Sequence, residues 1–392
     1  MLTVKDLKVS VEDKTILNGI NLAWINFGRD LQDFDEPEFV NVLDSIADAN
    51  GNTLRWWLHT DGSTSPIYDE DGFVTGLGEN DLRNLRRALD LAYERGVLIL
   101  PTLWSHDMMN LKPGVDTEAN QRMIEDREYT QAYIDNALVP MVEALAGHPG
   151  IVAWEIFNEP EGVTEEYGWT DLRTTMPSIQ QFVNLLAGAI HRADPAALVT
   201  NGSWNMQVLT DIGDFTNYYT DERLIAAGGD EDGTLDFYQV HYYPEHFDEA
   251  TSPFHNPYTY WELDKPLVIG EFPAKAIANL GRGFLPERQL RHSMESYEFL
   301  WNNGYAGALA WTYYASEFGN MLDATPGILR INNLAPEHVQ VEIGDIDRIP
   351  VVLADIEGVI VPNDTEALPE GQRGGDRTLL YAEDGPGRDV AE

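Results

Sequence analysis

The sequence of 392 residues contains no cysteine, which excludes disulfide bonds, thiolate metal sites and a cysteine nucleophile. Lysine is also scarce, with six among the 25 basic residues, and the 66 acidic residues give a formal net charge of −41. A surface of that sign repels nucleic acid and anionic membranes, so we expect neither as a partner. High salt screens such self-repulsion, and the acidic, lysine-poor composition therefore favours a marine or halophilic source.

Long hydrophobic runs are missing too. No run of about 18 apolar residues exists, which argues against a membrane-spanning helix. The first residues lack the apolar segment of a secretion signal, which by itself favours an intracellular protein. Hydrophobic residues nevertheless make up 43% of the chain and aromatic residues 10%, enough for a sizeable folded core.

Short apolar runs alternate with helix-length segments through most of the chain. Eight runs are predicted as strands: 19–26, 52–59, 97–104, 151–158, 198–204, 237–243, 266–271 and 307–314. Helical patterns lie between most of them, at 36–49, 79–95, 127–145, 177–192 and 286–302. Continuous apolar strands separated by helices indicate a buried parallel sheet, and eight such units predict an α/β fold, the (β/α)₈ TIM barrel. A doubly wound open sheet is the alternative, but no Gly-x-Gly-x-x-Gly follows the first strand.

Three regions are expected along the chain. Residues 1–18 are predicted to form an N-terminal hairpin that closes the bottom of the barrel, and residues 19–325 the catalytic barrel itself. No helix is expected beyond residue 325. Residues 326–392 are predicted to contain short strand-like pieces followed by an acidic, Gly/Pro-rich tail.

Chemistry-bearing residues stand at the ends of the predicted strands, where a barrel of this type builds its active site. Arg, His, Glu, Trp or Tyr occur at seven of the eight strand ends. The fourth strand leads into the stretch WEIFNEPEG, in which Glu159 directly follows the strand. Of its two neighbours, Glu155 is expected to be a buried structural carboxylate, and Glu161 a solvated loop residue or a contact at the rim. Glu271 follows the seventh strand in the same way.

Glu159 and Glu271 therefore face each other across the predicted barrel mouth. Hydrolysis of a glycosidic bond needs two carboxyl groups that flank the scissile oxygen, one with a raised pKa to donate a proton and one ionised. Arg55, His241 and Tyr243 are placed to keep the second group ionised through charge and hydrogen bonds. The acidic turns at 69–72 and 230–233 lack the full spacing of a calcium loop, so no metal site is predicted.

The ordered set of residues on successive strands resembles glycoside hydrolase family 5, in the clan of retaining (β/α)₈ glycosidases, over residues 19–320. The residues that carry the resemblance are Arg55, His106, Asn158, Glu159, His241, Tyr243, Glu271 and Trp311.

The resemblance implies a role for each of them. Glu159 would be the acid/base and Glu271 the nucleophile of a double displacement that needs no metal or cofactor. Asn158 would hold the sugar 2-hydroxyl, Tyr243 and Arg55 would support the nucleophile, and His241 would bridge toward the acid/base. Trp311 would be the stacking floor of the −1 subsite. Aromatic faces pack well on sugars, so Trp104 and Trp204, each at a strand end, are further candidate platforms.

The expected substrate is a β-1,4-linked polysaccharide, most closely a β-mannan, because the WEIFNEP run and the tryptophans resemble mannanases. An endo-β-1,4-glucanase and an exo-β-mannosidase stay open, as does a catalytically inactive carbohydrate-binding protein on the same scaffold. We expect a monomer whose partner is the polysaccharide or oligosaccharide. A polymeric substrate favours a secreted or cell-surface protein, with an intracellular one as the alternative.

Overall fold

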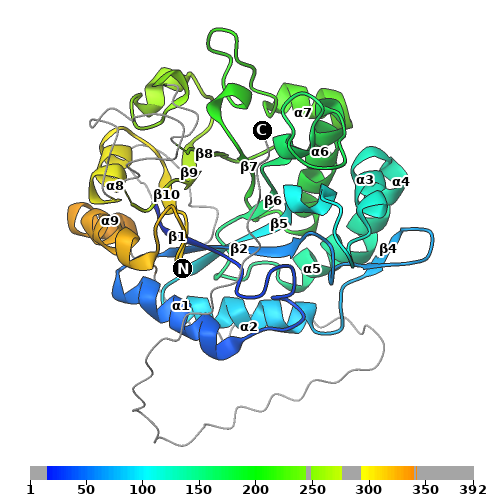
Figure 1. The fold of residues 1–392 in the computed structure, drawn as a ribbon, viewed down its shortest axis with the longest axis horizontal. Helices are drawn as coiled ribbons and strands as arrows, with labels where there is room; N and C mark the ends of the chain where they lie inside the picture. Colours follow the sequence, from blue (N-terminus) through cyan, green and yellow to red (C-terminus); the bar gives the residue numbers. More distant parts are fainter. Residues whose placement is uncertain (1–15, 244–248, 276–292, 340, 342–392) are drawn as a thin grey trace, which may run out of the picture. The chain divides into compact units, whose positions relative to one another are not determined.

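Eight parallel strands close into a barrel in the computed structural model, which describes residues 16–243, 249–275, 293–339 and 341. Around the barrel the strands follow the order β1-β10-β9-β8-β7-β6-β5-β2 (Figure 1). Their bounds are Leu17–Ala23 for β1, Thr53–Thr60 for β2, Leu98–Ser105 for β5, Trp154–Asn158 for β6, Val199–Ser203 for β7, Tyr238–His241 for β8, Leu267–Glu271 for β9 and Gly307–Ala310 for β10. The predicted TIM barrel is confirmed.

Every residue of these eight strands is buried, which explains why the strands read as continuous apolar runs. One face of each strand meets the helices, and the other points into the barrel, where side chains fill the interior. Both faces are therefore shielded from water. The polar residues that do lie inside the strands, such as Asn21, Arg55 and Glu155, are buried and need partners there.

Helices surround the barrel, as the outer coiled ribbons of Figure 1 show. They are α1 Glu36–Asp48, α2 Asp81–Tyr93, α3 Thr117–Glu125, α4 Arg127–Tyr133, α5 Val139–Ala144, α6 Met176–Ala193, α7 Asp221–Gly228, α8 Ser293–Asn302, α9 Met321–Leu334 and α10 Pro336–Val339. The predicted helix 127–145 is present, but a π-helical turn at Ile134–Leu138 divides it into α4 and α5. Pro140, which has no amide hydrogen to donate, lies just beyond this turn.

Helix α9 was not expected, and the prediction that no helix follows residue 325 is wrong. The helix begins with a capping box: the Asn320 side chain accepts bonds from the Leu322 and Asp323 amides, and Asp323 accepts one from the Asn320 amide. Pro326 and Gly327 read as helix breakers, and Pro326, the sixth residue of the helix, removes the bond that an amide there would donate to the carbonyl of Leu322. The helix nevertheless continues through both residues to Leu334. The expected boundary at 325 thus falls inside α9.

The other terminal predictions lie almost wholly outside the described residues. Of the expected hairpin 1–18, the structure describes only residues 16–18, and two of these belong to β1. Of the expected region 326–392, residues 326–339 belong to α9, α10 and the residue between them, and the remainder, apart from residue 341, is outside the described part.

The two acidic loops that superficially resemble calcium loops form turns. Asp69 accepts bonds from the amides of Asp71 and Phe73 within the hairpin between β3 (Ile67–Tyr68) and β4 (Val74–Gly76). In the second loop the Gly233 amide donates to the carbonyl of Asp230.

Candidate active site

An open cleft of 630 Å³ lies at the C-terminal ends of the strands. Seven of the ten predicted site residues line it: His106, Asn158, Glu159, Trp204, Tyr243, Glu271 and Trp311. Arg55 and His241 are fully buried directly beneath, in contact with the two glutamates. The residues that the sequence places on separate strands therefore converge on one site.

Trp104 is the exception, and its prediction as a sugar platform is wrong. Its side chain is fully buried and packs against His59 and against Tyr133 of α4, on the helix side of the strand. The pairing of β2 with β5 shifts register between Trp57 and Thr60, so strict alternation along β5 could not give the direction of this ring.

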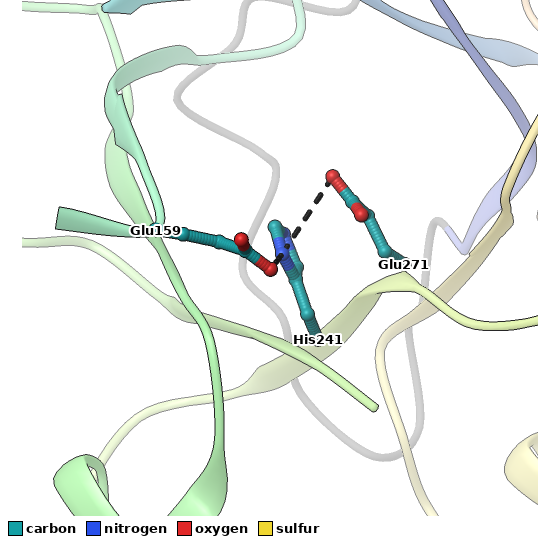
Figure 2. Close-up of side chains that lie close together, drawn as sticks. All are labelled: Glu159, His241 and Glu271. Carbon is teal, nitrogen blue, oxygen red and sulfur yellow. Dashed lines mark hydrogen bonds and ion pairs between the residues drawn. The ribbon is translucent and has the colours of Figure 1, made fainter. Parts of the chain in front are cut away.

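Glu159 and Glu271 lie on neighbouring parts of the cleft with His241 between them (Figure 2). The side chains of these three residues approach within 4.8 Å of one another. Nδ1 of His241 is 2.8 Å from Oε1 of Glu159 and 3.6 Å from Oε1 of Glu271. Retaining glycosidases hold their two carboxyl groups about 5–5.5 Å apart and inverting enzymes about 6.5–9.5 Å, so an approach of two carboxyl oxygens to within 4.8 Å favours the retaining arrangement.

The backbone of Glu159 is in the left-handed region, with φ of 52°. A non-glycine residue there costs on the order of 1 kcal/mol, and such positions cluster at active sites. The Glu159 amide donates to the carbonyl of Gly202 on β7 at 2.7 Å, which holds the strained residue at the end of β6. The carboxyl group is turned toward His241 as a result (Figure 2).

Arg55 connects the buried layer below the cleft to Glu271. Its Nη1 donates to Oε1 of Glu271 at 2.6 Å, and its Nε and Nη2 each donate to a different oxygen of Glu155, also at 2.6 Å. Nη2 further donates to Oδ1 of Asn158 at 2.7 Å. Glu155 is thus a buried structural carboxylate, as predicted, and it keeps the guanidinium group in place through a bidentate pair.

Two further residues fix the carboxyl groups from the cleft side. The Tyr243 hydroxyl donates to Oε2 of Glu271 at 2.6 Å, and His106 lies with Nδ1 3.6 Å from Oε2 of Glu159. Asn21 on β1, which the sequence reading missed, accepts from Arg55 at 2.8 Å. A polar residue inside an otherwise apolar first strand was the available signal for it.

The two carboxyl groups differ in their positive partners. Burial would raise the pKa of Glu159, but the hydrogen bond with His241 and the nearby positive charge lower it overall. Burial raises the pKa of Glu271, and the charge of Glu159 adds to this against His241 and Arg55. The guanidinium of Arg55 is in direct contact with Glu271, at 2.6 Å, so a fixed positive charge lies beside this carboxyl group and favours its ionised form.

Aromatic side chains border the cleft at both ends. Trp24, Trp57 and Trp311 contact one another at centroid distances of 5.2–6.2 Å, on the side of β1, β2 and β10. Tyr167, Trp169 and Trp204 form the opposite border, with Trp204 5.9 Å from Trp169 and 6.3 Å from Tyr167. Flat apolar rings on both sides of a carboxyl pair suit a chain of sugars.

Among the described residues, Glu159, His241 and Glu271 are the group close enough to share a metal ion. Glu271 already accepts from the guanidinium of Arg55 and from Tyr243. A fixed positive charge at 2.6 Å opposes a cation at the same oxygens, so the residues fit proton transfer and nucleophilic attack better than metal binding.

Glu161 departs from its prediction as a solvated or rim residue. It is fully buried, accepts from the Tyr219 hydroxyl at 2.5 Å and accepts from the Trp204 amide at 3.1 Å. The short helical turn Pro160–Val163 carries its side chain under the loop that follows β7, rather than out into solvent.

The chain is similar to known proteins along most of its length. The family model described as Cellulase (glycosyl hydrolase family 5) matches residues 12–317. The mannan endo-1,4-beta-mannosidase of Mytilus edulis is 34% identical, in an alignment that covers 84% of this chain and 90% of that protein. The mannan endo-1,4-beta-mannosidase of Cryptopygus antarcticus is also 34% identical, over 76% of this chain and 81% of that protein.

Solved structures give the same result. The X-ray structure of the blue mussel beta-mannanase superimposes with a TM-score of 0.72 at 33% identity, covering 81% of this chain and 92% of that one. The endo-1,4-beta-mannanase of Eisenia fetida superimposes with a TM-score of 0.72 at 32% identity, covering 82% and 92%. With the carboxyl pair, the barrel and the family model in agreement, this chain belongs to glycosyl hydrolase family 5.

Proposed function

We propose that the protein is an endo-β-1,4-mannanase that cleaves mannan by double displacement with retention of configuration. The observation that carries the proposal is the pair Glu159 and Glu271 around His241, with carboxyl oxygens that approach more closely than in inverting enzymes. The choice of mannan is supported by relatives that carry the name of an endo-mannanase and align with 84% of the chain.

In the proposed first step, a carboxylate oxygen of Glu271 attacks the anomeric carbon and Glu159 gives its proton to the departing glycosidic oxygen. The bond between the anomeric carbon and that oxygen breaks, and a covalent glycosyl ester with Glu271 forms. Arg55 and Tyr243, both within 2.6 Å of Glu271, stabilise the charge on the nucleophile before attack. Because Arg55 donates to Oε1 and Tyr243 to Oε2, one of the two donors still binds the carbonyl oxygen of the ester after the other oxygen has attacked.

In the proposed second step, the ionised Glu159 takes a proton from a water molecule that attacks the same carbon. The ester bond breaks, Glu271 leaves as a carboxylate, and the sugar is released with its original configuration. Asn158 lines the cleft next to Glu159 and is held by Arg55, which suits a side chain that binds the sugar 2-hydroxyl. Trp311 lines the same cleft and offers an apolar face to the sugar ring.

The proposed steps need no residue from a second copy of the chain, and we propose a monomer. A polysaccharide substrate supports action outside the cell. In the described part of the chain, no helix has the length and apolar character needed to cross a membrane.

Product analysis tests the proposal. Ivory-nut mannan, carob galactomannan and barley β-glucan are each digested, and the products are separated by size. We expect a ladder of manno-oligosaccharides from both mannans, with the β-anomer formed first, and no ladder after Glu271→Ala. Release of mannose alone would indicate exo action, and preferential cleavage of barley glucan would indicate the endo-glucanase instead.

A further inference from the structure

Glu161 is a buried carboxyl group with no place in the steps described so far. It stands two residues after Glu159, in the turn Pro160–Val163, and its side chain has no exposed surface. Its Oε1 accepts from the hydroxyl of Tyr219, and its Oε2 accepts from the amide of Trp204. Both partners belong to the loop that follows β7, whereas Glu161 belongs to the loop that follows β6. One carboxyl group therefore joins these two loops.

Through the amide of Trp204, Glu161 reaches the border formed by Tyr167, Trp169 and Trp204, which we call the aromatic wall. The next residue, Gly162, supports the same wall from below. A Cβ atom at Gly162 would lie 2.6 Å from Cζ2 of Trp169, so the ring packs directly on the glycine. Trp169 also contacts His106 at a centroid distance of 5.3 Å. Glu161 and Gly162 therefore set the position of the wall together.

The aromatic wall lies on the Glu159 side of the cleft. Trp169 contacts His106, and His106 in turn lies 3.6 Å from Glu159, whereas Trp24, Trp57 and Trp311 occupy the opposite border. The group that Glu159 protonates departs on its own side, away from Glu271. The sugars of the leaving group thus face the aromatic wall, where Trp169 is 43% exposed and its ring is open to a ligand.

We infer that Glu161 is a positioning residue that holds the aromatic wall in place for the sugars of the leaving group, through its contacts with Trp204 and Tyr219. The inference rests on the proposed function for the position of those sugars relative to Glu159. It assigns to Glu161 an effect on substrate binding on one side of the cleft rather than a part in proton transfer.

The surroundings of Glu161 support the neutral form. The ionisable groups that face it are Glu159, Tyr219 and Tyr167, and no described lysine, arginine or histidine makes an ion pair with it. Burial raises the pKa of Glu161 to about 7, with a contribution from the charge of Glu159. A protonated Oε1 can donate to the Tyr219 oxygen while Oε2 still accepts from the Trp204 amide. Glutamine can reproduce both contacts with its amide group, whereas alanine can reproduce neither.

The test compares Glu161→Ala, Glu161→Gln and the control Glu165→Gln, which changes an exposed carboxyl group in the same loop. Each variant is assayed on a manno-oligosaccharide and on a dinitrophenyl β-mannobioside, whose leaving group is small and needs no proton. For Glu161→Ala we expect KM on the oligosaccharide to rise about tenfold, with kcat/KM on the dinitrophenyl substrate within about twofold of the parent. Glu161→Gln and Glu165→Gln should match the parent on both substrates near neutral pH.

Equal losses on the two substrates after Glu161→Ala would overturn the inference, because they would place the effect at Glu271 or at the sugar that both substrates share. A fall in kcat on the oligosaccharide with KM unchanged would overturn it as well, because it would place the effect on proton donation by Glu159. Unchanged kinetics would overturn it too. If Glu161→Ala does not fold, the comparison of the parent with Glu161→Gln above about pH 7 decides. The parent should then lose kcat/KM on the oligosaccharide, and Glu161→Gln should keep it; superimposed profiles would contradict the inference. If the enzyme cleaves glucan but not mannan, the proposed function fails, and the same comparison is made with cello-oligosaccharides.

Discussion

At the scale of single residues, the position of Arg55 explains how two buried carboxyl groups acquire different tasks. Both glutamates lie close to Nδ1 of His241, but only Glu271 is in direct contact with the guanidinium of Arg55. Arg55 in turn keeps its place through Glu155, so removal of the Glu271 carboxyl group still leaves the buried charge paired. Because Arg55 keeps a second carboxylate partner, a loss of activity after substitution of either glutamate can be attributed to the missing catalytic group rather than to unfolding.

Substitution of either glutamate should therefore give a distinct kinetic result. Glu271→Ala is expected to lower kcat by at least about 10³-fold on every substrate, since the nucleophile is gone. Glu159→Ala should lower kcat on mannan by about 10²–10⁴-fold. On a dinitrophenyl glycoside it should instead show a burst of dinitrophenolate and recover turnover with added azide. Assays of both variants on both substrates check this; the same loss for both variants on the dinitrophenyl substrate would contradict the assignment of roles.

Glu161 also makes a prediction about stability and pH. Its pKa in the folded protein is raised to about 7 by burial, above its ordinary value of 4.5, so the native state holds the proton more tightly. The contribution of this tighter proton binding to the free energy of unfolding is complete below about pH 4.5 and is lost as pH rises through about 7. Between about pH 5 and pH 8 the parent should lose about 2 kcal/mol more free energy of unfolding than Glu161→Gln.

Urea unfolding of both proteins at several pH values measures this difference. Glu165→Gln, at an exposed carboxyl group, should follow the parent curve. Parallel curves for the parent and Glu161→Gln would show that Glu161 titrates at its ordinary pH range in the folded protein.

At the scale of elements, the predictable parts were those in which burial imposes a pattern. The eight strands and the ends that carry Glu159 and Glu271 could be read because parallel strands buried on both faces are apolar throughout. The direction of a single ring could not be predicted, as Trp104 shows, because the register between β2 and β5 shifts beside it. The burial of Glu161 could not be predicted either, because it depends on Tyr219, 58 residues away in the chain.

Helix α9 was missed because two breaker residues, Pro326 and Gly327, stand near its beginning, while the signal in its favour is the side-chain pair Asn320 and Asp323. Gly327 is needed for packing: a Cβ there would lie 2.3 Å from Cδ2 of Tyr297 in α8. Gly327, which by itself predicts a helix break, thus allows α8 and α9 to pack closely.

The capping box of α9 gives a prediction at this scale. Asn320→Ala removes the acceptor for the Leu322 and Asp323 amides and should lower the free energy of unfolding by about 1 kcal/mol. The cap is outside the cleft, so kcat and KM should stay within about twofold of the parent. Denaturant unfolding and a standard assay check both values. Asn320→Asp, which keeps the acceptor, serves as the control, and a loss as large as that of alanine would contradict the capping role.

At the scale of the whole molecule, the net charge of −41 opposes compactness, because 66 acidic side chains outnumber 25 basic ones and repel one another. Surface ion pairs such as Arg29 with Asp33 and Arg87 with Glu36 act in the opposite direction, but exposed pairs contribute at most about 1 kcal/mol each. Salt screens both effects, and repulsion among the excess acids is the larger one. Added salt should therefore stabilise the protein.

We expect Tm to rise by several degrees as sodium chloride increases from about 0.01 M to about 1 M, over which the screening length falls from about 30 Å to about 3 Å. Most of the rise should come below about 0.3 M, since charge repulsion is screened first. Choline chloride should give the same curve, and sucrose at equal osmolality should not. Hydrolysis should respond differently, because a neutral polysaccharide feels little of the field, so KM should change by less than about twofold over the same range. A Tm that falls with salt would show that ion pairs, rather than repulsion, dominate the electrostatic free energy of the folded protein.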